Sequence, residues 1–125
     1  MARRTAARAG PRDHTRGSVH PFHYDLADIH GLSDLMARVE ARVGPVDVLV
    51  NCAGFNREIP VLELTPEAWR AILAVDLEAP VMLAVAAARG MAARGYGRIV
   101  NITSVHGVYG AERSIPSAHG ACGAG

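Results

Sequence analysis

The chain has 125 residues, half of them apolar and a fifth charged, which is the composition of a globular protein and argues against a disordered one. At this length it forms one domain or part of one. The net charge of +1 gives no electrostatic basis for binding nucleic acid, and none of the basic residues is a lysine.

Targeting, membrane and metal signals are absent from the sequence. No secretory apolar region follows Met1, and the arginine-rich beginning lacks the serine of a targeting peptide. The most apolar run, 79–88, is too short to cross a bilayer and contains Pro80, so we expect no membrane partner. Cys52 and Cys122 lack metal-site spacing, and we expect reduced thiols, no metal and a cytoplasmic protein.

The first predicted elements are a strand and a helix. Residues 1–18 read as the end of a helix and a loop, and Val19–Tyr24 (VHPFHY) predicts a short strand, which Pro21 weakens because it cannot donate to a sheet. Apolar residues then recur at spacings of three and four, which predicts an amphipathic helix ended by Gly44-Pro45. These residues are Leu32, Leu35, Met36, Val39 and Val43.

A second strand and a long helix follow. Val46–Asn51 (VDVLVN) is a nearly continuous apolar run and predicts a strand buried on both faces. Thr65-Pro66-Glu67 marks a helix start, with an N-cap, a first-turn proline and an acid at the positive dipole end. The helix reaches at least Ala88, and Pro80 predicts a kink because it removes one backbone donor.

The last predicted element is a strand over Arg98–Ser104, after a break at 95–97. Residues 105–125 read as a loop and a low-complexity tail, so the folded part is expected to be 19–104. The alternation of strand and helix predicts parallel βαβ units, an α/β sheet with helices on its faces.

Polar and small residues follow each predicted strand. Ligands of open parallel sheets bind beyond the carboxyl ends of the strands. Asp25 follows the first strand, 51–54 (NCAG) the second and 101–104 (NITS) the third. These three segments are therefore the candidate binding residues.

Four segments of the chain resemble the short-chain dehydrogenase/reductase family. VDVLVNCAG (46–54) resembles its LVNNAG motif, and GRIVNITS (97–104) its segment with the catalytic serine. TPEAWRAILAVDLEAP (65–80) resembles its connecting helix, and DLAD (25–28) the acidic turn that holds adenine. The resemblance implies a Rossmann-like fold and hydride transfer between NAD or NADP and a carbonyl or alcohol. It implies a small-molecule substrate such as a 3-oxoacyl thioester, a sugar or a small ketone.

The resemblance also assigns cofactor contacts. Asp25 would contact the adenine amino group, with the backbone of Leu26 beside it. Asn51, Ala53 and Gly54 would line the adenine ribose and the nicotinamide side. The alternative for Asn51 is a cap at the end of a strand.

Two catalytic positions are carried over in the same way. Ser104 would hydrogen-bond the substrate oxygen and orient it for transfer. At Asp76 the family usually has an Asn that supports a proton-relay water. An Asp could keep the backbone contact of that relay, but it adds a charge.

The chain departs from the family at its Tyr/Lys pair and its glycine-rich turn. The family's acid/base Tyr follows the serine by about a dozen residues and its Lys comes four later, where this chain has Ser117 and Ala121. Arginine does not easily replace that lysine, because it stays protonated and is shaped as a fork. No TGxxxGxG turn is present, since 1–18 contains only Gly10 and Gly17. We therefore expect a partial doubly wound sheet of about three strands and two main helices, lacking the first two strands.

Two functions from different classes follow. The first is a fragment of an NAD(P)-dependent short-chain oxidoreductase, inactive as this chain. The alternative is a non-catalytic interaction module that associates with a full-length homologue through the 66–88 helix, a surface that would also serve a homo-oligomer.

Overall fold

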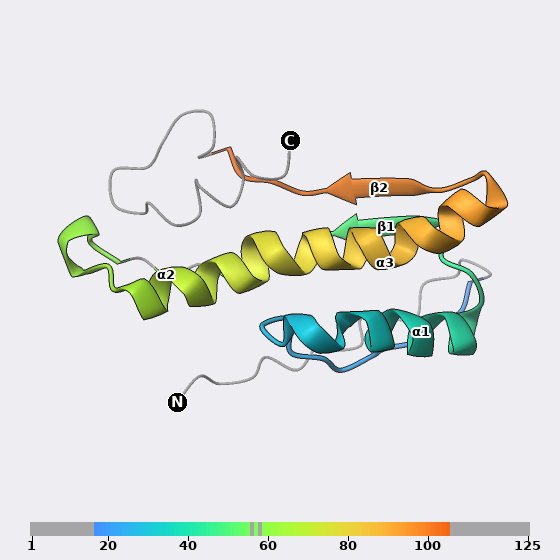
Figure 1. The fold of residues 1–125 in the computed structure, drawn as a ribbon, viewed down its shortest axis with the longest axis horizontal. Coiled ribbons are helices and arrows are strands. Elements are labelled where there is room, and N and C mark those ends of the chain that lie inside the picture. Colours follow the sequence, from blue (N-terminus) through green and yellow to red (C-terminus); the bar gives the residue numbers. More distant parts are fainter. Residues whose placement is uncertain (1–16, 56, 58, 106–125) are drawn as a thin grey trace.

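The computed structural model describes residues 17–55, 57 and 59–105 (Figure 1). The predicted segments before and after these ranges, including the positions of Ser117 and Ala121, lie outside the described residues. The helices are α1 (Leu32–Val43), α2 (Pro66–Leu73) and α3 (Ala79–Arg94), the strands are β1 (Val48–Asn51) and β2 (Arg98–Asn101), and the short turns are η1 (Ile29–Gly31), η2 (Val61–Glu63) and η3 (Ala74–Glu78).

The two strands form a parallel pair, with Val48 opposite Arg98 and Asn51 opposite Asn101. Parallel neighbours need a crossover connection, and here the helix that runs from α2 through α3 supplies it. The predicted α/β class and βαβ order are confirmed.

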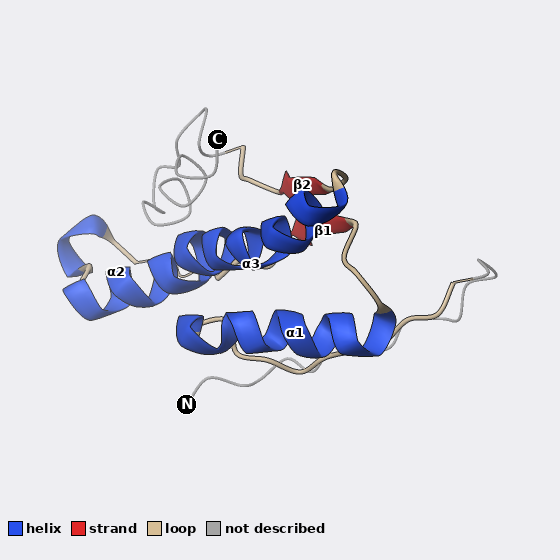
Figure 2. Ribbon diagram, turned by 45° about the vertical axis from the view of Figure 1, so that its right-hand side comes forward, coloured by secondary structure: helices blue, strands red, loops and turns tan. Residues whose placement is uncertain are grey.

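Helix α3 packs against both strands, and α1 packs against α3 on the side away from β2 (Figures 1 and 2). The buried side chains fall into two clusters, and Leu83 of α3 touches both. One cluster consists of Leu32, Leu35 and Ala79, and the other of Met36, Ala87 and Met91. The core therefore lies between the two helices and on one face of the sheet.

Helix α1 has the predicted amphipathic pattern and the predicted end. Leu32, Leu35 and Met36 are buried, as the spacing of three and four requires. Gly44 follows the last turn with φ of 93°, which favours glycine, and its N–H donates to the carbonyl of Glu40 at 2.9 Å.

The long helix starts as predicted but is interrupted in a different way. The Oγ1 of Thr65 accepts from the N–H of Ala68 at 3.2 Å, a side-chain N-cap. Instead of a simple kink at Pro80, the helix forms a π-helical turn, η3, in which the N–H of Ala79 donates to the carbonyl of Ala74. Proline has no N–H for the ordinary ladder, so the wider turn replaces one α-helical bond.

The whole helix, Pro66–Arg94, is 29 residues long and by length and composition could cross a membrane. The core helices of soluble proteins pass the same test. Here α3 packs against both strands and α1, and 17% of the most apolar window of the long helix is buried inside the chain.

The connection from α3 to β2 depends on two glycines. Gly95 has φ of 68°, and the N–H of Tyr96 donates to the carbonyl of Met91 at 3.1 Å, the pattern of a Schellman cap. A Cβ on Gly97 would collide with the side chain of Met91. The predicted break at 95–97 is confirmed, and the second glycine lets β2 begin close against the helix.

Two strand predictions are wrong. Val19–Tyr24 forms no strand, because Pro21 offers no N–H and no described strand lies beside this segment to pair with it. The described residues thus contain two strands rather than about three. β1 is not buried on both faces either: Val48 and Val50 are 52% and 54% exposed, because the packed helices cover only the opposite face.

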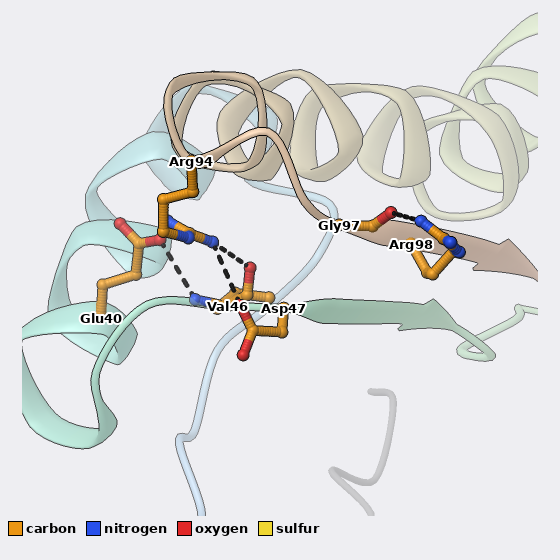
Figure 3. Close-up of polar contacts among 6 residues, drawn as sticks. All are labelled: Glu40, Val46, Asp47, Arg94, Gly97 and Arg98. Carbon is orange, nitrogen blue, oxygen red and sulfur yellow. Dashed lines mark hydrogen bonds and ion pairs between the residues drawn. The ribbon is translucent and has the colours of Figure 1, made fainter.

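A set of polar contacts joins the elements at the starting end of the strands (Figure 3). The guanidinium of Arg94 donates to the carbonyl of Val46 at 2.7 Å and lies 3.6 Å from the carboxylate of Asp47. The N–H of Val46 donates to Glu40 Oε1 at 3.4 Å, and the N–H of Arg98 donates to the carbonyl of Asp47 at 2.9 Å. We call this set the Arg94 brace, since it connects the ends of α1 and α3 to the starts of both strands.

We expect Arg94→Ala to lower the free energy of unfolding by about 1 kcal/mol, because it removes a charged donor from a backbone carbonyl and weakens an ion pair. Arg70→Ala is the matched control, since Arg70 is 76% exposed and pairs only with Glu67 of its own helix, at 3.9 Å. Urea unfolding followed by the fluorescence of Trp69, the single tryptophan, measures both. Equal losses from the two substitutions would show that the brace contributes no more than a surface arginine does.

Candidate functional site

The carboxyl ends of the two strands are held together by Asn51. Its Nδ2 donates to Asn101 Oδ1 at 2.9 Å and, over a longer 3.4 Å, to the carbonyl of Pro80 at the start of α3. Its backbone carbonyl accepts from the N–H of Ile102 at 2.8 Å. The side chain of Asn51 thus bridges β1, β2 and α3. The sequence left two roles open for this residue, a cap at the end of a strand and a cofactor contact, and these hydrogen bonds are those of a strand-end cap.

The segment Cys52–Phe55, which we call the post-β1 loop, leaves the sheet at the same edge and is exposed throughout. The N–H of Phe55 donates to Asp76 Oδ1 at 2.6 Å. A Cβ placed on Gly54 would lie 3.9 Å from the same oxygen and meet no other described atom within 4 Å. The backbone at Gly54 therefore has open space on the side where a Cβ would lie, and the contact of Ala53 and Gly54 with a cofactor stays a prediction.

Asp76 lies in the π-helical turn η3 and is half-buried. Burial raises the pKa of its carboxyl group above the ordinary value, and the hydrogen bond from the Phe55 N–H opposes that rise in part. π-Helical turns and perturbed carboxyl groups both concentrate at functional sites. The geometry therefore supports the choice of Asp76 as a candidate, and its contact is with the post-β1 loop.

Asp25 and Leu26 lie in a turn before η1. Asp25 Oδ1 accepts from the N–H of Ala27 at 3.1 Å, and the carbonyl of Asp25 accepts from the N–H of Asp28 at 3.0 Å. The side chain of Leu26 packs against the buried cluster that contains Leu32. These contacts fix the shape of the turn, and the predicted contact of its acid with adenine stays a prediction.

Ser104 is half-buried, three residues beyond the end of β2. Its role at a substrate oxygen, like the other assigned roles, stays a prediction. Among residues 17–55, 57 and 59–105, no group of three His, Cys, Asp or Glu side chains is placed to hold a metal ion.

Two partners in this site were not predicted from the sequence. Asn101 faces Asn51 because the parallel register places the two strand ends opposite each other. The identical residue at both strand ends was a signal that could have suggested the pair. The Phe55 N–H carries no such signal, since any residue except proline provides one.

We expect Asp76→Asn to raise the free energy of unfolding at neutral pH, by less than about 1 kcal/mol because the group is only partly buried. The pKa of Asp76 is higher in the folded state than in the unfolded state, so the protonated carboxyl group favours folding. This contribution to stability is complete at pH values below the ordinary carboxyl pKa, and it is lost as pH rises through the raised pKa. The amide keeps an acceptor for Phe55 without a buried charge. Urea unfolding at several pH values should show the difference between the two proteins shrink as pH falls; a difference that is independent of pH would contradict the assignment.

The family model described as short chain dehydrogenase matches residues 2–118. The acetoacetyl-CoA reductase of Rhizobium meliloti (strain 1021) is 39% identical over 89 residues, which are 71% of this chain and 37% of the relative. The gluconate 5-dehydrogenase of Gluconobacter oxydans (strain 621H) is 37% identical over 82 residues, 66% of this chain and 32% of the relative. The chain thus spans about a third of the length of these curated relatives.

Solved structures agree with this match. A gluconate 5-dehydrogenase from Burkholderia cenocepacia J2315, in complex with NADP and tartrate, superposes with a TM-score of 0.74 at 36% identity, over 80% of this chain and 39% of that one. A metagenomic short-chain oxidoreductase in complex with NADP gives a TM-score of 0.73 at 33% identity, over 79% and 45% of the two chains. On the family match, the identities and the shared βαβ fold, the chain belongs to the short-chain dehydrogenase/reductase family.

Proposed function

We propose that this chain is a fragment of an NAD(P)-dependent oxidoreductase that acts on a carbonyl or alcohol of a small molecule. The observation that carries the proposal is the exposed, small-residue post-β1 loop at the carboxyl edge of the sheet, with Gly54 open to a ligand. Two solved structures with the same fold are complexes with NADP. The names of two curated relatives describe reduction of acetoacetyl-CoA and oxidation of gluconate. We place the protein in the cytoplasm as part of the same proposal.

The residues at the carboxyl edge of the sheet have different proposed roles. Ala53 and Gly54 present backbone to the nucleotide, and the bridge made by Asn51 keeps that backbone at the end of the sheet. When bound, NAD or NADP would supply or accept the hydride. Ser104 would hydrogen-bond the substrate oxygen, and a donor at that oxygen stabilises the charge that develops there.

This chain alone is proposed not to complete a turnover. General acid/base catalysis contributes on the order of 10²–10⁴ in rate, and the family's acid/base pair needs a lysine that the sequence does not contain. Arginine would keep its charge but not the compact geometry of an ammonium group. Binding of the nucleotide and hydride transfer are therefore separate expectations for this chain.

Nucleotide binding is tested with Gly54→Val, for which we expect roughly a tenfold weaker affinity for NADPH, because branched carbons would occupy the open side of the loop. Gly17→Val is the matched control, since a Cβ there meets nothing within 4 Å. Titration of NADPH fluorescence measures both variants, and the nicotinamide absorbance in the presence of acetoacetyl-CoA follows turnover. No nucleotide binding by the parent chain, or equal weakening in the two variants, would contradict the proposed site.

A second candidate, a non-catalytic interaction module, is favoured by one observation. Val81, Met82 and Val85 are exposed large apolar side chains within two turns of α3. Only 17% of the most apolar window of this helix is buried inside the chain. Apolar surface of this kind marks interaction sites. The partner proposed is the same helix of a second copy or of a full-length homologue.

We expect Val85→Glu to convert a self-associated chain to monomer, because it would bury a charge in the contact. Ala41→Glu, an exposed position on α1, is the control and should leave the mass unchanged. Light scattering after size-exclusion chromatography gives the mass, with and without the Rhizobium meliloti acetoacetyl-CoA reductase. A monomeric parent chain that also fails to co-elute with the homologue would remove this candidate.

A further inference from the structure

The contact between Asp76 and the post-β1 loop carries an inference that neither proposed function requires. The N–H of Phe55 donates to Asp76 Oδ1 at a nitrogen-to-oxygen distance of 2.6 Å, a short hydrogen bond. Asp76 and Phe55 are 21 residues apart, so the bond joins the crossover helix to the loop that leaves β1. This side-chain hydrogen bond joins the loop to the helix.

The π-helical turn fixes the position of Asp76 in the helix. The N–H of Ala79 donates to the carbonyl of Ala74, and Pro80 has no N–H to donate, so the helix is wider at the residues between 74 and 79. The carbonyl of Pro80 accepts from Asn51, so the same turn is tied to the end of β1. The side chain of Asp76 is thereby held at a fixed place relative to both the strand and the loop.

No ion pair holds the Asp76 carboxylate among the described residues. The charged groups in the same turn, on α2 and beyond the loop are Glu78, Glu67, Arg70 and Arg57, and all four are exposed. The influences on the ionisation of Asp76 are its burial and the Phe55 N–H. A charge change at Asp76 would therefore act first on the loop.

We propose that Asp76 is a positioning residue whose ionised carboxylate anchors the post-β1 loop, and that protonation of this carboxylate slackens the loop while it stabilises the fold. The two effects have opposite signs because they depend on different interactions. The hydrogen bond from the Phe55 N–H is stronger when its acceptor is charged. The desolvation of that charge, however, lowers the free energy of unfolding of the whole chain. A purely structural side chain would change loop and fold in the same direction.

The test is an amide NMR titration of the ¹⁵N-labelled chain, with Asp76→Asn and Asp76→Ala. In the parent, the Phe55 amide resonance should move with pH at a midpoint above the ordinary carboxyl range, and its protection from exchange should fall about fivefold on the acid side, after correction for intrinsic exchange. Asp76→Asn should match the acid form at every pH. Asp76→Ala should show the least protection, because it leaves no acceptor.

Asp47→Asn is the matched control, since this carboxylate lies at the opposite end of the sheet beside Arg94 and should leave the Phe55 titration unchanged. A Phe55 resonance that does not titrate in the parent, or that titrates equally in Asp76→Asn, would overturn the proposal. If Asp76→Ala fails to fold, Asp76→Asn still tests the proposal, because its side chain has the same shape as aspartate but does not titrate. No nucleotide is present, so the result is independent of whether the chain binds NADPH.

Discussion

The missing N–H of Pro80 is the constraint on which the site depends. A parallel strand pair requires a crossover, and here the crossover is one continuous helix whose ladder cannot be completed at this residue. The helix widens into the η3 turn instead of breaking. That widening sets where Asp76 lies, and the carbonyl of the same proline receives the amide of Asn51. A single residue without a donor thus links the helix geometry to the edge of the sheet.

The two ends of the sheet are held by different chemistry. At the starting end, Arg94 provides a charged donor to Val46 and an ion pair to Asp47, contacts that tolerate solvent because the charge stays partly exposed. At the carboxyl end, neutral amides of Asn51 and Asn101 make the bridge. Because these amides carry no net charge, the electrostatic potential at this edge depends on the charged groups near it, among them Asp76. The division keeps the structural arginine away from the edge at which ligands of parallel sheets bind.

The sequence predicted the features that arise from local chemistry. The spacing from Leu32 to Met36, the N-cap Thr65 and the glycines at 44 and 95 each depend on neighbours within a few residues, and each is confirmed. Features that depend on distant partners were predicted less well. Val19–Tyr24 has strand-forming residues, but none of the strands in the described part of the chain lies beside it, and a strand needs a neighbour to accept its hydrogen bonds. At the site, the sequence indicated Asn51, Gly54 and Asp76 as candidate residues. It did not predict the contact of Asn51 with Pro80 or of Asp76 with Phe55, because both depend on where the long helix lies relative to β1.

The aspartate at position 76 makes sense only if its charge does something that an amide cannot. An Asn would accept the same hydrogen bond from Phe55 without the cost of desolvating a carboxylate, so packing alone gives no reason for the acid. A stronger bond to the loop is one gain, because charged acceptors hold N–H groups about twice as firmly as neutral ones. The loop it holds includes Gly54, the residue whose open side is suited to a ligand. The chain therefore gives up some stability of the fold to fix the segment at which binding is proposed, a trade of the kind that functional sites make.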